Sequence, residues 1–515
     1  MDVQTNHGEM SKSEAAAWFW SVCLAFSSLW VLLAFLLHEG YRFDVIELQL
    51  VAKEWVIADR KLPMLPAWIL ETLNILTNRA FIAPFIAAAL CTVVTLFSVW
   101  RLARKVLSER LALLGTFTML PFWSITVDSV NFNHNSTLMA CWTFTMLAFY
   151  NAFQTNKKRW WIAAGLALGL GFHSKYTMVL LAFALLLYSL WFPRFRLYWK
   201  QLGPWLTISL TLLVFFPHLL ALHQMGFWTN ILYAADQAYL EETFRVGARI
   251  YYPVEWIVCQ VGWVFFSPLL LLIPSLGRKW RIQKPQSEVE KETLRFLFCC
   301  MAFPCLVYIG IAVVLGSKIY SAYGYTLWFF LGVYLLLRFQ RTDSRAIFRQ
   351  TLGLIALMVF VWVIVFIIQA TVSPSIKGTP RGFQFPMRAL GAECDRIWTE
   401  RFGDLPCPYT TGRWKLAGNA AYAMKDRPSV HFYYRRLEDM KAQPTGTWST
   451  DEDVNQKGGL VLWYASKTPV PTAPQWVHLR FPKAEVFPEI LVLPYNTGTD
   501  VPPLKVGIAI VPPPE

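Results

Sequence analysis

Long apolar stretches recur along most of this chain, and they constrain its fold more than any other feature. A helix needs about 20 predominantly apolar residues to cross the hydrocarbon core of a bilayer. We predict eleven such spans, and they lie near residues 17–37, 80–100, 110–127, 136–153, 160–173, 176–192, 202–222, 252–276, 294–316, 319–337 and 350–371. The pattern therefore indicates an all-α polytopic membrane domain.

The composition supports a membrane protein and excludes two other classes. Of the 515 residues, 55% are hydrophobic and only 16% are charged, whereas soluble proteins carry about 25% charged residues. The net charge is +14, but no basic stripe lies on a soluble domain, so we expect no nucleic-acid partner. The first apolar run lacks a small-residue cleavage site, which favours a retained span over a signal peptide.

The charges in the loops predict the topology. With a cytoplasmic N-terminus, all the inside loops are basic: RLARKVLSER, NKKR, PRFRLYWK, GRKWRIQKPQSEVEK and RFQRTDSRAIFR. The short outside loops, DSVNFNHN, HSKY and GSK, carry at most one lysine each. Since positive residues accumulate on the cytoplasmic side, eleven spans place the C-terminus outside.

Three longer segments lie on the predicted outer side. The first, 38–79, contains DVIELQLVAKEW and PAWILETLNIL, whose apolar spacing predicts amphipathic helices at the membrane interface. The second is the loop 223–251. From 372 to 515 short alternating runs such as GGLVLWYA predict a soluble, mixed α/β domain after a transmembrane domain of residues 1–371. Cys394 and Cys407 lie in this domain, where an oxidising compartment would allow them to pair.

Two acids in the first outer loop are candidate catalytic residues, because ionisable groups beside spans are costly. Asp44 opens a predicted helix in GYRFDVIELQL, and Glu47 follows at i+3 on the same face. A structural alternative stays open, in which Asp44 is the N-cap of this helix and Glu47 its capping-box partner.

Three cationic or titratable residues on the outer side are candidates for binding substrate. Lys175 lies at the mouth of a span, where it either binds a phosphate or extends its ammonium to the interface. His218 is either functional or hydrogen-bonded in the core. Arg245 opposes the positive-inside trend, so it either binds a phosphate or contacts lipid headgroups.

The polar run VDSVNFNHN separates two apolar spans on the outer side. Its Asn133 and Asn135 are costly at the entrance of a span unless they cap it or bind something. We weigh two interpretations, in which Asn135 is the N-cap of the next helix or the asparagines bind substrate.

Several segments together resemble a known superfamily, and they cover nearly the whole chain in order. They are FDVIELQLVAKEWVIADRKLPMLPAW at 43–68, FNHN at 132–135, RWW and GLALGLGFHSKY within 159–176, FPHLL at 216–220 and LAGNAAYAMKDRPSV at 416–430. These motifs are similar to those of the lipid-dependent glycosyltransferases with the multispan C-type fold. That superfamily includes the dolichyl-phosphate-mannose protein mannosyltransferases, the aminoarabinose transferase of lipid A and galacturonosyltransferases of the lipopolysaccharide core.

The resemblance implies a reaction and a location. A sugar on a polyprenyl phosphate would pass, with inversion, to a glycolipid or glycan acceptor on the outer side of a bacterial inner membrane. Asp44 matches the acid that such enzymes use as the general base. FNHN would line the cavity opposite this acid, and the resemblance therefore assigns Asn133, His134 and Asn135 to substrate binding.

The chain departs from the pattern at the donor phosphate. Relatives read HPPLPAW or carry a lysine before the paired prolines, whereas Leu62 and Met64 interrupt that motif here. Lys61, one residue earlier, is the candidate replacement. The residues show no metal-ligand set and we expect no cofactor, although some relatives use a divalent cation. Two alternatives stay open, a transporter for a lipid-linked glycan and a non-catalytic relative.

Overall fold

The computed structural model describes residues 9–59, 63–226, 247–275, 285, 287–339, 343–373, 376, 380–433, 448–465, 472–495 and 501–514. The chain divides into two compact units. The first comprises residues 1–32, 60–65 and 85–364, and the second comprises 33–59, 66–84 and 365–515. The first outer loop thus groups largely with the C-terminal segment, and the domain boundary after residue 371 stays a prediction.

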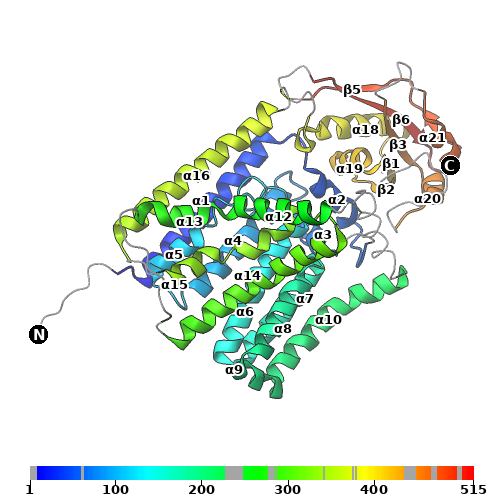
Figure 1. The fold of residues 1–515 in the computed structure, drawn as a ribbon. Coiled ribbons are helices and arrows are strands. Elements are labelled where there is room, and N and C mark those ends of the chain that lie inside the picture. Colours follow the sequence, from blue (N-terminus) through cyan, green and yellow to red (C-terminus); the bar gives the residue numbers. More distant parts are fainter. Residues whose placement is uncertain are drawn as a thin grey trace, which may run out of the picture. The chain divides into compact units, whose positions relative to one another are not determined.

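The membrane part of the chain consists of helices (Figure 1). Their bounds are α1 (Lys12–Leu37), α4 (Ala83–Ala103), α5 (Glu109–Phe117), α6 (His134–Thr155), α7 (Lys158–Ser174), α8 (Met178–Trp191), α9 (Pro193–Arg196), η1 (Leu197–Lys200), α10 (Leu202–Gln224), α12 (Ala248–Val264), α13 (Phe266–Leu272), η2 (Ile273–Ser275), α14 (Glu288–Leu315), η3 (Ser321–Trp328), α15 (Leu331–Arg338) and α16 (Arg345–Thr371).

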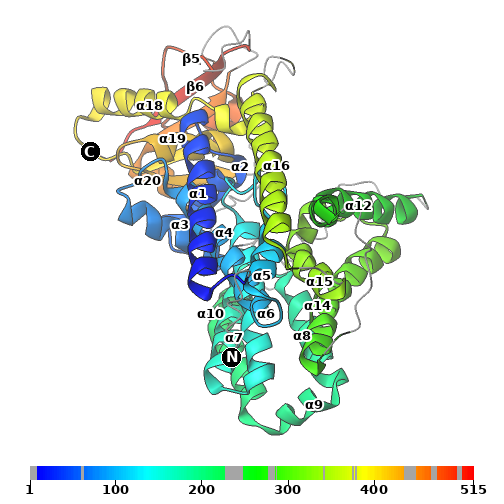
Figure 2. The same ribbon diagram turned by 90° about the vertical axis from the view of Figure 1, so that its left-hand side faces the viewer.

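Helix α7 packs closely against α10 (Figure 2). Glycines on α7 allow this close approach. A Cβ on Gly165 would lie 2.8 Å from the carbonyl oxygen of Thr207, and one on Gly169 would lie 2.7 Å from Val214. The Thr207 hydroxyl donates to the carbonyl of Trp161 at 2.8 Å. Small residues and interhelical hydrogen bonds are the usual means of packing helices in lipid.

The membrane-spanning character is confirmed. In the described part of the chain, six helical segments are long and apolar enough to cross a bilayer, namely α1, α4, α10, α12 with α13, α14 and α16. A seventh is added if α8 and the following Pro193–Lys200, bent by 99°, form one span. The other predicted windows coincide with α5, α6, α7, and η3 followed by α15. The count of eleven stays a prediction.

Two of these windows are less regular than their hydropathy predicts. Residues 110–127 form a helix only as far as Phe117 and then continue in successive turns. Pro121 explains part of this irregularity, since it has no N–H to donate and disfavours helical backbone in the residue before it. Residues 319–337 divide into η3 and α15.

The second unit confirms the predicted mixed α/β domain. Its elements are α2 (Phe43–Ala52), α3 (Leu65–Leu76), η4 (Gly382–Gln384), α18 (Met387–Phe402), β1 (Tyr409–Arg413), α19 (Trp414–Ala423), β2 (Ser429–Tyr433), α20 (Asp451–Lys457), β3 (Gly459–Tyr464), α21 (Gln475–Arg480), β4 (Glu485–Val486), β5 (Leu491–Leu493) and β6 (Leu504–Val511). The sheet order is β2-β1-β3-β6-β4, with β5 also paired to β6. Strands β2, β1 and β3 are parallel, and β6 is antiparallel to its neighbours.

The two helices predicted in the first outer loop are present as α2 and α3. The apolar side of α2 includes Ile46 and Leu50, and these side chains pack on α19 through Gly418. A protein surface therefore accounts for the amphipathic pattern of α2, where we had expected the membrane interface. In the same unit, Cys394 and Cys407 are buried free thiols, so the structure shows no disulfide between them.

Candidate active site

Asp44 lies in the first turn of α2, and its side chain is exposed. The N-cap of this helix is Arg42, in extended conformation and without a side-chain capping bond. Asp44 is therefore the second residue of the helix, so the alternative in which Asp44 and Glu47 form a capping box is wrong. A carboxylate in the first turn is favoured by the helix dipole. Glu47 follows one turn later and is half-buried.

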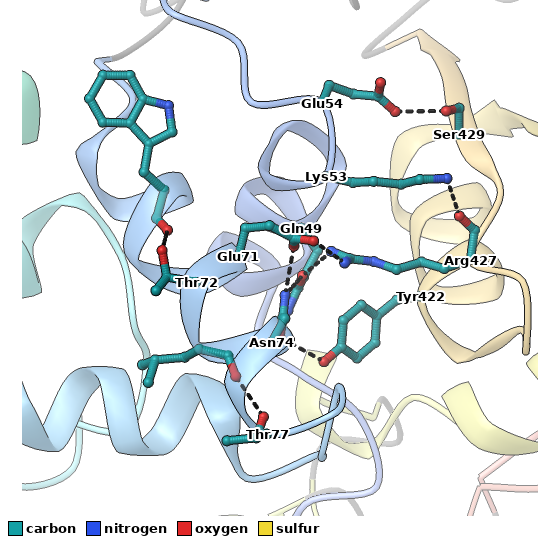
Figure 3. Close-up of polar contacts among 12 residues, drawn as sticks. Gln49, Lys53, Glu54, Glu71, Thr72, Asn74, Thr77, Tyr422, Arg427 and Ser429 are labelled. Atoms are coloured by element: carbon teal, nitrogen blue, oxygen red, sulfur yellow. Dashed lines mark hydrogen bonds and ion pairs between the residues drawn. The ribbon is translucent and has the colours of Figure 1, made fainter.

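A buried polar network that the sequence did not reveal supports the helix that carries Asp44 (Figure 3). Arg427 donates to Glu71 Oε1 at 2.7 Å and to Gln49 Oε1 at 3.0 Å. Asn74 donates to Gln49 Oε1 at 2.9 Å and to Glu71 Oε2 at 3.0 Å. The side chains of Arg427 and Glu71 are only 3% and 7% exposed. Removing one member of such a pair would leave a buried, uncompensated charge.

Two tyrosines extend this network. Tyr422 donates to Asn74 Oδ1 at 3.2 Å, and Tyr41 donates to the Tyr422 hydroxyl oxygen at 3.3 Å. Burial raises the pKa of both hydroxyls. Each therefore stays protonated at neutral pH and remains able to donate. The guanidinium of Arg427 also lies 5.4 Å from the centroid of the Tyr422 ring, within the range of a cation–π contact.

One sequence signal pointed to part of this network. Glu71 and Asn74 follow Ala67 and Leu70 at helical spacing, so they lie on the buried stripe of α3. An acid on such a stripe predicts a buried partner, because an unpaired buried carboxylate is very costly. The sequence does not indicate that the partner is Arg427, which lies 356 residues later.

In the first unit, the asparagines of FNHN have different environments. Asn133, rather than Asn135, is the N-cap of α6, and its Oδ1 accepts from the Asn135 and Ser136 amides at 2.8 and 3.3 Å. An asparagine therefore caps this helix, as the alternative proposed, but it is Asn133 and not Asn135. His134 Nε2 lies 3.1 Å from the carbonyl oxygen of Pro63.

Asn135 and Lys175 form a pair at the ends of α6 and α7. The Lys175 ammonium donates to Asn135 Oδ1 at 2.8 Å and lies 4.2 Å from the centroid of the Tyr323 ring. Lys175 is the C-cap residue of α7 and is half-buried. The structure thus brings together two of the predicted ligands through a direct hydrogen bond.

His218 lies in the core of the helical unit. It is fully buried in α10, and its Nε2 lies 2.8 Å from the Tyr176 hydroxyl. His173, from α7, is hydrogen-bonded to the carbonyl of Val214 at 2.9 Å. These contacts match the core alternative for His218, and they tie α7 and the residues that directly follow it, which include Lys175, to α10.

Two predicted ligands, Lys61 and Arg245, lie outside the described residues. Among the residues that the structure describes, no group of three or more His, Cys, Asp or Glu side chains is placed to hold a metal ion.

Comparisons with known proteins identify related proteins for both the sequence and the fold. Residues 61–220 match the model of the family described as dolichyl-phosphate-mannose-protein mannosyltransferase. No curated protein sequence matches the chain significantly. The fold is similar to that of ArnT from Cupriavidus metallidurans bound to undecaprenyl phosphate, with a TM-score of 0.60 at 11% identity, over 98% of this chain and 99% of ArnT. The apo state of ArnT gives a TM-score of 0.54 at 12% identity, over 96% and 98% of the two chains.

The two kinds of match agree with the motifs read from the sequence. The family match covers FNHN, GLALGLGFHSKY and FPHLL. The fold match extends over the C-terminal mixed α/β segment as well. The protein therefore shares the fold of ArnT, and the predicted resemblance to the dolichyl-phosphate-mannose protein mannosyltransferases is confirmed for residues 61–220.

Proposed function

We propose that this protein is an integral-membrane glycosyltransferase that moves a hexosyl or pentosyl group from a polyprenyl phosphate to a cell-envelope acceptor. The observation that carries the proposal is the fold match to undecaprenyl-phosphate-bound ArnT over 98% of the chain. The acceptor class is lipid A, the lipopolysaccharide core or another envelope glycan. The location is the bacterial inner membrane, with the N-terminus cytoplasmic and the C-terminal domain periplasmic.

Asp44 is the proposed general base. Its carboxylate takes the proton of the acceptor hydroxyl while that oxygen forms a bond to the anomeric carbon. The bond between the anomeric carbon and the phosphate oxygen breaks, and its electron pair leaves with the polyprenyl phosphate. The anomeric configuration inverts in this single displacement. Exposure in the first turn of α2 supports the assignment, because a base must come within hydrogen-bond reach of the hydroxyl.

Lys175 and Asn135 are the proposed ligands of the donor in the helical unit. Their mutual hydrogen bond holds the ammonium in place, and a fixed positive charge stabilises a departing phosphate. Five further residues stay proposed substrate ligands, namely Lys61, Asn133, His134, His218 and Arg245, with weaker support for Asn133, which caps a helix, and for His218, which lies in the core. Glu47 stays a proposed catalytic residue.

Replacing Asp44 by Asn tests the proposal. Losing a general base slows transfer by about 100- to 10,000-fold. The modified acceptor should therefore disappear, while the polyprenyl phosphate that still carries its sugar accumulates. Mass spectrometry of lipopolysaccharide and polyprenyl-phosphate glycans, with and without the protein, detects both species and identifies the sugar. Asp404→Asn, the same change at another exposed aspartate, is the control. Full transfer by Asp44→Asn would refute the assignment of the base.

A further inference from the structure

Helix α2 belongs to the first outer loop, yet its apolar side packs on α19, which begins 371 residues later. Ile46 and Leu50 face Gly418 in α19, where a Cβ would lie 3.0 Å from Ile46 Cγ2 and 2.7 Å from Leu50 Cδ2. Gly418 has no Cβ, and α2 can therefore approach the backbone of α19 closely. The position of α2 is thus set by direct contact with the C-terminal segment.

Polar contacts fix the C-terminal end of α2 to the same segment. Arg427 Nη2 donates to Gln49 Oε1 at 3.0 Å, and Lys53 Nζ donates to the carbonyl of Arg427. Ser429 donates to Glu54 Oε1 at 2.7 Å. Both the side chain and the main chain of Arg427 therefore hold this end of the helix.

The N-terminal end of α2 is fixed as well. The amides of Glu39 and Gly40 donate to the carbonyl of Phe383 at 2.9 and 2.8 Å. The Lys415 ammonium lies 3.5 Å from the centroid of the Phe43 ring. Phe43 directly precedes Asp44, so contacts on both sides of the proposed base come from residues beyond 380.

Arg427 is the centre of this arrangement. It is 2% exposed and joins Gln49 of α2 to Glu71 of α3 through two guanidinium nitrogens. Its backbone has φ = 49°, in the left-handed region that a non-glycine residue adopts at a cost. Lysine has no planar fork with which to reach both acceptors.

We infer that Arg427 is a positioning residue for the transfer reaction, acting by holding the helix that carries Asp44 at a fixed place and angle. Its catalytic meaning rests on the proposed function. A misplacement of about 1 Å in a reacting group lowers the rate about 100-fold. A loss of this size is expected when the contacts of Arg427 with Gln49 and Glu71, here called the clamp, are removed. The C-terminal segment then serves as the support of the catalytic helix.

Hydrogen exchange tests the clamp without any substrate. In the full-length protein in detergent, Arg427→Gln should speed amide exchange in 43–52 by at least about tenfold, because a buried ion pair is broken. Arg480→Gln is the control, since it removes another buried arginine, which is paired at 2.9 Å with the half-buried carboxylate of Asp451 between α21 and α20. Equal exchange of 43–52 in the two variants would overturn the inference.

Transfer measured in cells completes the test. Arg427→Gln should lower the rate at which the modified acceptor appears by about 100-fold at matched protein level, and Arg427→Lys should lose less. Arg480→Gln should stay within a fewfold of the unsubstituted protein. Wild-type transfer by Arg427→Gln overturns the inference. If the unsubstituted protein transfers nothing, the proposed function fails, and the exchange result still decides whether Arg427 holds α2. If the Arg427→Gln protein does not accumulate, amide exchange and transfer are both measured on Arg427→Lys instead.

Discussion

Gly418→Ala is expected to destabilise the second unit although alanine is the better helix former. In an open helix this change gains about 1 kcal/mol. Here the new Cβ would lie 2.7 Å from Leu50 Cδ2 and 3.0 Å from Ile46 Cγ2. Overpacking of this kind costs about 1–3 kcal/mol, which leaves a net loss of up to about 2 kcal/mol. In a unit of this size, each kcal/mol lowers Tm by about 2–4 °C.

Thermal unfolding of the purified protein in detergent measures the effect. Gly310→Ala in α14 is the control, because among the described residues no atom beyond the local helix backbone lies within 4 Å of the Cβ that it adds, and it should leave Tm unchanged or raised. Leu50→Ala should relieve the clash, so the double variant should lose less stability than the two single losses together, by about 0.5–3 kcal/mol. A rise in Tm for Gly418→Ala that matched the rise for Gly310→Ala would refute the close approach of α2 and α19.

Three further outcomes are expected. Arg427→Gln should lower the free energy of unfolding by about 3–5 kcal/mol, because it leaves the Glu71 carboxylate buried without its cation. The double variant with Glu71→Gln and Arg427→Gln should lose less stability than the two single variants lose together. Burial alone would raise the pKa of Asp451, but hydrogen bonds from His431, Tyr433 and Arg480 outweigh it and lower the pKa. The resulting stabilisation is present above about pH 4 and is lost as pH falls through the lowered pKa, so Tm should fall less between pH 5 and pH 3 in Asp451→Asn. Asn133→Ala removes the cap of α6 and should cost about 1 kcal/mol; an unchanged Tm would contradict the capping role.

Local patterns predicted much of the fold because hydropathy and helical spacing are local properties. The windows around α1, α4, α10 and α16, the two helices of the first outer loop and the mixed α/β character after residue 371 were all readable from composition and periodicity. The break after Phe117 was less visible, since its turns occur inside a sequence that stays apolar.

The site was only partly predictable, for a different reason. Asp44, Asn135 and Lys175 were predicted as candidates from their position at the edge of a span and from resemblance, and their roles stay predictions. The hydrogen bond between Asn135 and Lys175 came from the structure alone. Arg427 was not identified, because its partners are Gln49 and Glu71, far away in the sequence. A single sequence shows that a buried acid needs a cation, but it does not show which of many distant cations supplies it.

The distance of 356 residues between Glu71 and Arg427 also has a consequence in time. A ribosome that adds about 5–20 residues per second makes Arg427 about 20 to 70 s after Glu71. During that interval the first outer loop is already made, while Arg427, the buried cation that pairs with Glu71, does not yet exist. The network is therefore completed only after residue 427 has been made, and a nascent chain stopped before that residue carries Asp44 on a helix without its support.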